Sequence, residues 1–310
     1  MPQVSIARLF EDNREKLRLE WVAGRDGGAK ELNSEHTKDS SQGLIGHLNF
    51  IHPNLIQVLG TSEVAYLDKL DAPNCHKALA QVAIKELACF IVAGVDRAPA
   101  SLAAVAEATH TPLFLSPVAS VELMWMLRPY LARALAESTT THGVLLDVLG
   151  MGVLITGDSG VGKSELALEL VSRGSGLVAD DVVELYRIGP ETLEGRCPAL
   201  LKDFLEVRGL GVLNIRTIFG EAALRPRKNV KLIVNLGKPT ARMERLPLNA
   251  GSENIMGVDI RKVTIPVAAG RNLAVLTEAA VRNYVLQLRG FDSTQEFVSR
   301  QHESMKKSDS

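Results

Sequence analysis

The chain has 310 residues, enough for two ordinary domains that each have a hydrophobic core. Hydrophobic residues make up 46% and charged residues 23% of the sequence, a balance typical of soluble globular proteins. Lys plus Arg (35) almost cancels Asp plus Glu (36), so the chain lacks the positive charge of a nonspecific nucleic-acid binder. We therefore expect no nucleic-acid partner, although a local basic patch could still meet one acidic partner.

The targeting and cysteine signals favour the cytoplasm. The opening sequence MPQVSIARLFEDNREKLRLEW has early acidic residues and lacks the apolar centre of a signal peptide. No run of 18 apolar residues occurs, so we expect no membrane span. The three cysteines, Cys75, Cys89 and Cys197, show no CxxC spacing, which indicates structural thiols in a reducing compartment.

The first part of the chain reads as alternating helices and strands. Residues 23–43 are polar and rich in Gly and Ser, which predicts a long exposed loop. The patterns after it predict helices over 76–88, 98–110 and 120–138, the last kinked near Pro129, and short buried strands over 89–94 and 111–116. This alternation predicts a small α/β domain with a parallel sheet, over residues 1–136.

The second part, residues 137–310, has a different pattern. Two apolar runs separated by a glycine turn predict a β-hairpin. The predicted elements are strands over 143–149 and 152–156, a helix from Gly162 to Gly174, strand-like segments over 177–188 and 230–236, strand with glycine turns over 206–215, an amphipathic helix over 271–290 and a frayed polar tail over 301–310.

A glycine-rich segment between the second strand and the helix fits the phosphate-binding pattern G-x-x-x-x-G-K-[ST]. Its residues are Gly157, Asp158, Ser159, Gly160, Val161, Gly162, Lys163 and Ser164. The glycines allow a turn whose N–H groups point inward, and the following helix adds partial positive charge at the same place. We expect Lys163 to reach the β- and γ-phosphates of a nucleotide and the Ser164 hydroxyl to ligate Mg²⁺.

Two acids follow the next apolar strand, in LVADD, where P-loop proteins commonly carry a carboxylate toward the metal. Because strand neighbours point to opposite faces, only one of Asp180 and Asp181 faces the γ-phosphate unless the strand ends between them. A second acid beside the transferring phosphate would suit a proton acceptor for an attacking hydroxyl. A solvated pair at the end of a strand is the alternative.

Two further residues leave both functional and structural interpretations open. Glu206 precedes the glycine turn of EVRGLGVLNI and is either a carboxylate for Mg²⁺ or part of an ordinary turn. His142 begins the hairpin, where a lone histidine is more often structural than catalytic. The segment NLGKP, residues 235–239, does not match the guanine-reading N-K-x-D pattern, which disfavours a GTPase.

Five segments, in order from His142 to Asn272, resemble the HPr kinase/phosphorylase family. They are HGVLLDVLGMGVLITGDSGVGKSELALELVSRG, LVADDVVEL, EVRGLGVLNI, MERL and PVAAGRN, of which the first alone covers 33 residues. The N-terminal half resembles the first domain of the family more loosely, through NLIQVLG and the long helix before His142.

The resemblance implies an enzyme with two opposed activities. With ATP and Mg²⁺ it would phosphorylate a seryl hydroxyl of HPr, the phosphocarrier protein of the sugar phosphotransferase system. In reverse, inorganic phosphate would accept the phosphoryl group and pyrophosphate would be released. The resemblance also implies a homohexamer and a P-loop catalytic domain, residues 137–310, related to the PEP carboxykinase fold.

The resemblance also implies roles for single residues. The segment 157–164 would bind nucleotide phosphates, and Ser164 and Glu206 would ligate the metal. Asp181 would accept the proton in phosphorylation and donate it in the reverse step. The remaining implied active-site residues are His142, Lys163 and Arg245.

Two segments complete this set. Residues 206–215 match a region that the family needs for both reactions, and residues 266–271 match a region tied to dephosphorylation. Many relatives read P-V-R-P-G-R-N where this chain has Ala268 and Ala269. The missing arginine removes a cation that could hold phosphate or the partner, while Arg271 is retained.

Two other classes of function share the same P-loop. A P-loop kinase for a small metabolite would also use Asp181 but would need an enclosed substrate pocket. A nucleotide-sensing regulatory module would bind ATP without transferring phosphate, and the acids at 180, 181 and 206 disfavour it because a sensor needs no base.

Overall fold

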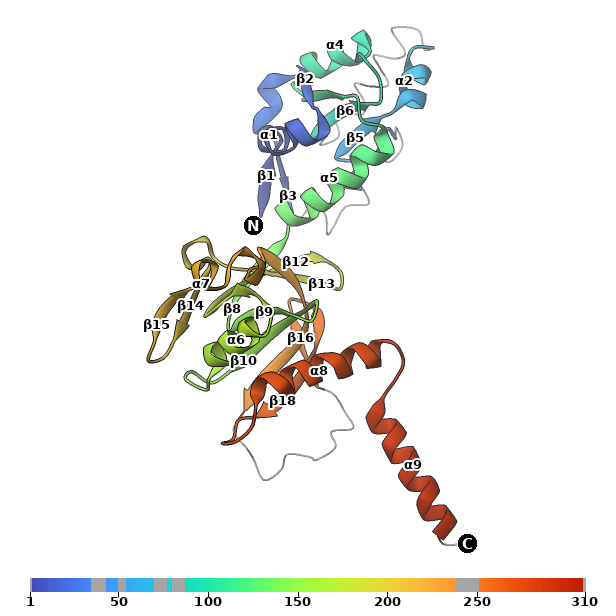
Figure 1. Ribbon diagram of the computed structural model, residues 1–310. Helices are drawn as coiled ribbons and strands as arrows, with labels where there is room; N and C mark the ends of the chain where they lie inside the picture. The colour runs from blue at the N-terminus through green and yellow to red at the C-terminus, as the bar shows by residue number, and fades with distance from the viewer. Residues whose placement is uncertain are drawn as a thin grey trace. The chain divides into compact units, whose positions relative to one another are not determined.

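The computed structural model describes residues 2–34, 43–49, 54–69, 77, 79, 87–237 and 251–308 of the chain. The chain divides into two compact units, Met1–Glu137 and Ser138–Ser310. Each unit combines helices and strands and has its own buried apolar core (Figure 1).

The first unit is an α/β layer structure. Its elements are β1 (Gln3–Ser5), α1 (Ile6–Leu17), β2 (Glu20–Ala23), the 3₁₀ helix η1 (Arg25–Ala29), β3 (Glu31–Asn33), β4 (Ile45–His47), β5 (Ile56–Leu59), α2 (Thr61–Leu67), β6 (Cys89–Ala93), α4 (Ala100–Ala108), β7 (Leu113–Ser116) and α5 (Ser120–Ala134). Five strands form one sheet in the order β2-β7-β6-β5-β4. β4 to β7 run parallel, and β2 joins the edge antiparallel to β7, so the expected parallel sheet carries one antiparallel edge strand.

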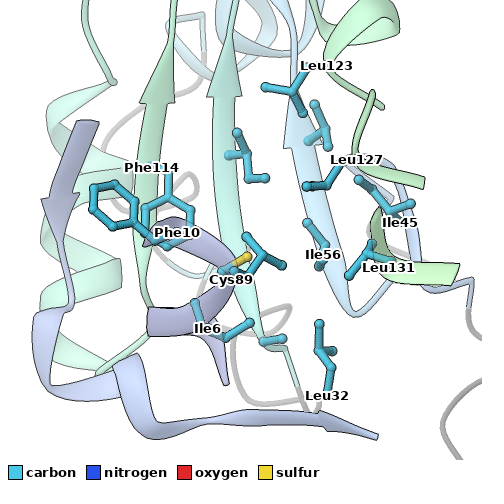
Figure 2. Packing of buried hydrophobic residues seen from close by; sticks show 14 of the residues in the cluster. Ile6, Phe10, Leu32, Ile45, Ile56, Cys89, Phe114, Leu123, Leu127 and Leu131 are labelled. Atoms are coloured by element: carbon cyan, nitrogen blue, oxygen red, sulfur yellow. The ribbon is translucent and has the colours of Figure 1, made fainter. Parts of the chain in front are cut away.

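Helices cover both faces of this sheet, so its central strand is apolar throughout. On β6, Cys89 and Ile91 pack with residues of α1 and α5, whereas Phe90 and Val92 pack with residues of α4. Figure 2 shows the first of these two faces and labels the members Ile6, Phe10, Leu32, Ile45, Ile56, Cys89, Phe114, Leu123, Leu127 and Leu131. The rings of Phe10 and Phe114 stack there with centroids 5.3 Å apart.

The second unit is built on a larger sheet. Its elements are β8 (Glu137–His142), β9 (Val144–Val148), β10 (Met151–Gly157), α6 (Lys163–Ser172), β11 (Gly176–Ala179), β12 (Val182–Gly189), β13 (Thr192–Arg196), the 3₁₀ helix η3 (Ala199–Leu201), β14 (Phe204–Val207), β15 (Gly211–Asn214), α7 (Ile215–Phe219), the 3₁₀ helix η4 (Glu221–Ala223), β16 (Arg227–Gly237), β17 (Gly251–Ile255), β18 (Val258–Pro266), α8 (Leu273–Leu288) and α9 (Ser293–Ser308). Strands β14 and β15 form a separate hairpin. The other nine strands form one sheet with the main order β11-β9-β10-β16-β13-β12-β8.

The long strand β16 joins two parts of this sheet. One flank of β16 pairs in parallel with β10. On the other flank, residues 227–229 pair with β13 and residues 232–237 pair with β18. Since β10, β16 and β18 are parallel, their carboxyl ends meet at one edge, which is where open α/β sheets bind ligands. Residues of α6 and α8 pack against one face of β9, β10 and β16 in a common apolar core (Figure 1).

Most of the predicted elements are confirmed. The strands predicted over 89–94 and 111–116 are β6 and β7, and the helices predicted over 98–110 and 120–138 are α4 and α5. The hairpin β9–β10, helix α6, strand β16 and helix α8 also lie where the sequence predicts them. Most of the helix predicted over 76–88 falls outside the described residues.

Three predictions are wrong in part. The segment 23–43 contains η1 and β3, because its glycines pack closely against Trp21 and Pro112 and β3 pairs with β1. The strand-like segment 177–188 is interrupted at Asp180 and Asp181 and forms two strands. The polar tail is not frayed from residue 301, because α9 continues to Ser308.

A close approach between β10 and β16 gives the first prediction. A Cβ atom at Gly152 would lie 2.1 Å from the carbonyl oxygen of Asn229, and backbone cannot move aside as a side chain does. We expect Gly152→Ala to destabilise the second unit by about 1–3 kcal/mol, the usual cost of overpacking. Gly251→Ala is the control, since its Cβ would meet nothing closer than 3.5 Å.

Chemical denaturation measures this effect with an internal reference. The two tryptophans of the chain, Trp21 and Trp125, both belong to the first unit, so their fluorescence reports on that unit. We expect far-UV circular dichroism to show an earlier transition for Gly152→Ala than for wild type or Gly251→Ala. Coincident transitions for all three proteins would contradict the close approach.

Candidate active site

The glycine-rich segment connects β10 to α6 at the carboxyl edge of the sheet. Gly160 and Gly162 have φ angles of 73° and 100°, which favour glycine and let the backbone curl before the helix begins. Lys163 folds over this curl and donates hydrogen bonds from Nζ to the carbonyl oxygens of Gly157 and Asp158, both at 3.0 Å. The strand, turn and helix therefore lie where the phosphate-binding pattern predicts them, and anion binding by the loop stays a prediction.

Asp180 lies buried directly beneath this loop. Its side chain belongs to a residue only 5% exposed. Oδ1 accepts a hydrogen bond from the Ser164 hydroxyl at 3.1 Å, and Oδ2 accepts one from the backbone N–H of Glu206 at 2.9 Å. Burial raises the pKa of Asp180 above its usual range, and these hydrogen bonds partly oppose that shift. The carboxylate thus joins the P-loop helix to strand β14.

Asp181 occupies a tight turn between β11 and β12. Its φ angle is 64°, unusual for a residue other than glycine, and the N–H of Val182 donates to the carbonyl oxygen of Asp180 at 2.8 Å across it. The strand therefore ends before both acids, so the alternation of a continuous strand does not apply to them. The Asp181 side chain is 72% exposed, whereas that of Asp180 is enclosed.

His142 is the nearest described partner of Asp181 from another element. It ends β8, and its Nδ1 atom lies 3.7 Å from Oδ1 of Asp181. The backbone holds the two together, because the N–H of Gly143 donates to the carbonyl oxygen of Asp181 at 3.0 Å. Both side chains are largely exposed, so the contact leaves the Asp181 carboxylate open to solvent and to a ligand.

The hairpin β14–β15 brings two more charged residues to the same place. Glu206 lies on β14 and is exposed, and its N–H is fixed by Asp180. Arg208 begins the turn of the hairpin and lies against Gly160 of the P-loop. Sequence reasoning did not single out Arg208, since an arginine in a turn forms no pattern. The one feature of the sequence that could have indicated Arg208 was its position between Glu206 and the glycines at 209 and 211.

Most of these residues, although not His142, line one open cleft of about 380 Å³. The lining residues are Ser159, Gly160, Gly162, Lys163, Ser164, Glu165, Asp180, Asp181, Glu206, Val207, Arg208, Gly209 and Gly211. The cleft combines the backbone of the P-loop, two cations and several carboxylates. That arrangement suits a nucleotide phosphate held next to a group that exchanges a proton.

The donors around the cleft are compatible with Mg²⁺. Ser164, Asp180, Asp181 and Glu206 offer only oxygen atoms, the ligands that this hard cation prefers. Over the described residues, no group of three or more His, Cys, Asp or Glu side chains is arranged to hold a metal by itself. One or two protein oxygens with phosphate oxygens and water are the usual Mg²⁺ environment, so Ser164 and Glu206 fit it.

Several predicted site residues do not line this cleft: among the described residues these include His142, Gly157, Asp158 and Val161. Arg245 falls outside the described residues. The segment 266–271 follows β18 at the same edge of the sheet as the P-loop. It is tied to α6 through Asn272, whose Nδ2 donates to Oε1 of Glu169 at 3.1 Å. Arg271 is exposed and does not line the cleft.

The fold and the cleft define a P-loop nucleotide-binding protein, as the sequence predicts. Residues 133–301 match the family described as HPr Serine kinase C-terminal domain, and residues 4–131 match HPr Serine kinase N terminus. The chain therefore belongs to the HPr kinase/phosphorylase family, and the expected order of an N-terminal α/β domain and a kinase domain is confirmed.

Two relatives illustrate the similarity. The HPr kinase/phosphorylase of Nitrosomonas europaea is 62% identical over 308 residues, which is 98% of this chain and 95% of the relative. That of Chromobacterium violaceum is 56% identical over 304 residues, 97% of this chain and 95% of the relative. The solved structure of the Hpr(Ser) kinase/phosphatase from Coxiella burnetii aligns with a TM-score of 0.47 and 38% identity, covering 51% of this chain and 98% of that one.

The buried carboxylate of Asp180 gives the second prediction. Because its folded-state pKa lies above the ordinary value of 3.8, the folded chain binds this proton more tightly than the unfolded chain. The stability of wild type relative to Asp180→Asn should therefore fall as pH rises from about 4 through the raised pKa. Denaturation followed by far-UV circular dichroism across this range gives the free energy of unfolding of both proteins. A wild-type value that rises with pH relative to that of Asp180→Asn would contradict the burial of this charge.

Proposed function

We propose that the protein transfers the γ-phosphoryl group of ATP to a seryl hydroxyl of HPr and that the same cleft catalyses the reverse, phosphorolytic reaction. The observation that carries this proposal is the position of Asp181, whose exposed carboxylate opens into the cleft that Lys163 lines. The names of the relatives support HPr as the substrate. The pairing of an anion site with an acid–base group supports phosphoryl transfer over simple nucleotide sensing.

In the kinase direction, Asp181 accepts the proton of the seryl hydroxyl as its oxygen attacks the γ-phosphorus. The new bond is between the seryl oxygen and phosphorus, and the bond that breaks joins the γ-phosphorus to the β–γ bridging oxygen of ATP. Lys163, together with Arg245, stabilises the negative charge on the transferring group. His142, whose Nδ1 lies 3.7 Å from Oδ1 of Asp181, adjusts the protonation of the acceptor phosphate in the reverse reaction.

In the reverse direction, inorganic phosphate occupies the anion site and one of its oxygens attacks the phosphorus of phosphoserine. The bond between phosphorus and the seryl oxygen breaks, and protonated Asp181 returns its proton to that oxygen. The products are seryl HPr and pyrophosphate. Backbone N–H groups that hold a nucleotide phosphate suit free phosphate equally, so one site serves both directions.

Ser164 and Glu206 are the residues that would hold Mg²⁺. When bound, this cation neutralises charge on the phosphate oxygens. The chain prepares both ligands through Asp180, which fixes the Ser164 hydroxyl and the Glu206 backbone. The Ser164 hydroxyl donates a hydrogen bond to Asp180, which leaves the lone pairs of its oxygen available.

Exposed apolar residues beside the cleft favour a protein substrate over a small metabolite. Leu210 and Val212, at the end of the hairpin whose turn lines the cleft, are each 66% exposed. Large apolar side chains gathered near a functional cleft are typical of a protein-docking surface. An enclosed pocket, which a metabolite kinase needs, is not what these residues form.

We also propose a homohexamer in the cytoplasm. The resemblance supports the assembly, and sedimentation of the purified protein at six times the mass of one chain tests it. Among the described residues, no helix has the length and apolar character needed to cross a bilayer.

The role of Asp181 gives the third prediction. Asp181→Asn cannot accept a proton, so we expect phosphorylation of HPr to slow by about 10²–10⁴-fold while ATP binding persists. Labelled ATP, Mg²⁺ and purified HPr, followed by detection of phosphoserine, measure the rate. Asp96→Asn, an exposed aspartate of the first unit, is the matched control. Turnover of Asp181→Asn within a few-fold of wild type would remove the residue from this role.

The shared site gives the fourth prediction. Lys163→Ala removes the P-loop cation, and we expect both HPr phosphorylation and pyrophosphate release from phospho-HPr with inorganic phosphate to fall together. Lys16→Ala on α1, also exposed, controls for loss of a lysine. Normal pyrophosphate release by Lys163→Ala would show that the two directions use different sites.

A further inference from the structure

Arg208 is held at the turn of the β14–β15 hairpin. Val207 pairs with Gly211 across the two strands, and the N–H of Leu210 donates to the carbonyl oxygen of Val207 at 3.0 Å. The turn therefore comprises residues 208–210. Its base is fixed one residue earlier, where the N–H of Glu206 donates to buried Asp180. The backbone that carries Arg208 is thus anchored to the residue that also holds Ser164.

The guanidinium of Arg208 lies on the backbone of the P-loop. A Cβ atom at Gly160 would lie 3.0 Å from Nη2 and 3.2 Å from Nη1 of Arg208. The absence of a side chain at Gly160 therefore makes room for the guanidinium as well as permitting the φ angle of 73°. Two separate segments of the chain, the P-loop and the hairpin, place this cation at the anion site.

No described residue takes up the hydrogen-bonding capacity of Arg208. Lys163 uses two of its three N–H donors on carbonyl oxygens of the loop. Arg208, by contrast, forms no hydrogen bond or ion pair with any residue in the described part of the chain, and it is exposed to the cleft. A guanidinium presents paired N–H groups that match two phosphate oxygens, which an ammonium cannot do.

We propose that Arg208 is a catalytic residue that binds the terminal phosphate of ATP, the group that is transferred. This assignment rests on the proposed phosphoryl transfer and adds to it a cation that approaches from the hairpin. The direction of approach selects the terminal phosphate, because Arg208 shares its hairpin with Glu206 and lines the cleft with Asp181, the proton acceptor. The inner phosphates belong to the N–H groups of the P-loop and the start of α6.

Comparison of ATP with ADP tests this position directly. Titration calorimetry on the full chain with Mg²⁺ measures both affinities for wild type, Arg208→Gln and Arg208→Lys, without HPr. We expect Arg208→Gln to weaken ATP binding by about 10–100-fold, the scale of charge-assisted hydrogen bonds, and to leave ADP within about 3-fold. Arg208→Lys keeps the charge but loses the paired N–H groups, so its ATP affinity should lie between those of wild type and Arg208→Gln.

The control is Arg128→Gln, an exposed arginine on α5 that should bind both nucleotides as wild type does. Far-UV circular dichroism verifies that each variant is folded. An equal loss of ATP and ADP affinity in Arg208→Gln, or no loss of either, would overturn the assignment. A wild-type protein that binds ATP but leaves HPr unlabelled would instead contradict the proposed function, and the ATP-against-ADP comparison distinguishes the two failures.

Discussion

The buried carboxylate of Asp180 is the constraint on which the site depends. Its oxygens accept hydrogen bonds from the Ser164 hydroxyl, at the start of α6, and from the Glu206 backbone on β14. A carboxylate taken out of water is costly unless its oxygens are hydrogen-bonded, so these two contacts are both required and mutually supporting. By satisfying them the chain fixes the distance between the P-loop and the hairpin. Glu206 and Arg208 reach the phosphate side of the cleft only because the base of their hairpin is held there.

The tight turn at Asp181 gives the adjacent acids Asp180 and Asp181 different surroundings. Both acids line the cleft, but Asp180 is buried and hydrogen-bonded to Ser164 and Glu206, whereas Asp181 is largely exposed. The turn places both at the end of β11, beside the P-loop, instead of on two faces of a sheet. The φ angle of 64° at Asp181 is unfavourable for a residue with a side chain, and residues in such conformations cluster at functional sites. The hydrogen bond from Gly143 to the Asp181 carbonyl helps to keep the turn closed and brings His142 beside it.

Local sequence patterns predicted much of the fold and part of the candidate site. The P-loop, the β9–β10 hairpin and the apolar strands β6 and β16 each depend on residues close in sequence, so periodicity and glycine spacing identify them. The turn at Asp181 was not predictable, because it depends on a hydrogen bond from Gly143 on another segment. Arg208 was missed for the same reason, since its position is set by contact with Gly160, 48 positions earlier in the numbering. Helix α9 was missed because the polar composition of residues 301–310 indicates fraying, although Glu296 and Arg300, one turn apart, form an ion pair within the helix.

The division of β16 between two sets of partners explains how distant segments meet at one site. Its carboxyl-terminal half pairs with β10 and β18, which places the P-loop and the segment after β18 at one edge. Its amino-terminal half pairs with β13, and through β13 and β12 the sheet continues to β8, which ends at His142. β12 in turn begins immediately after Asp181, so the strand order that delivers the histidine also delivers the acid. His142 and Asp181 therefore lie where the two parts of the sheet meet, because β8 leads directly into β9 and β11 leads directly into β12.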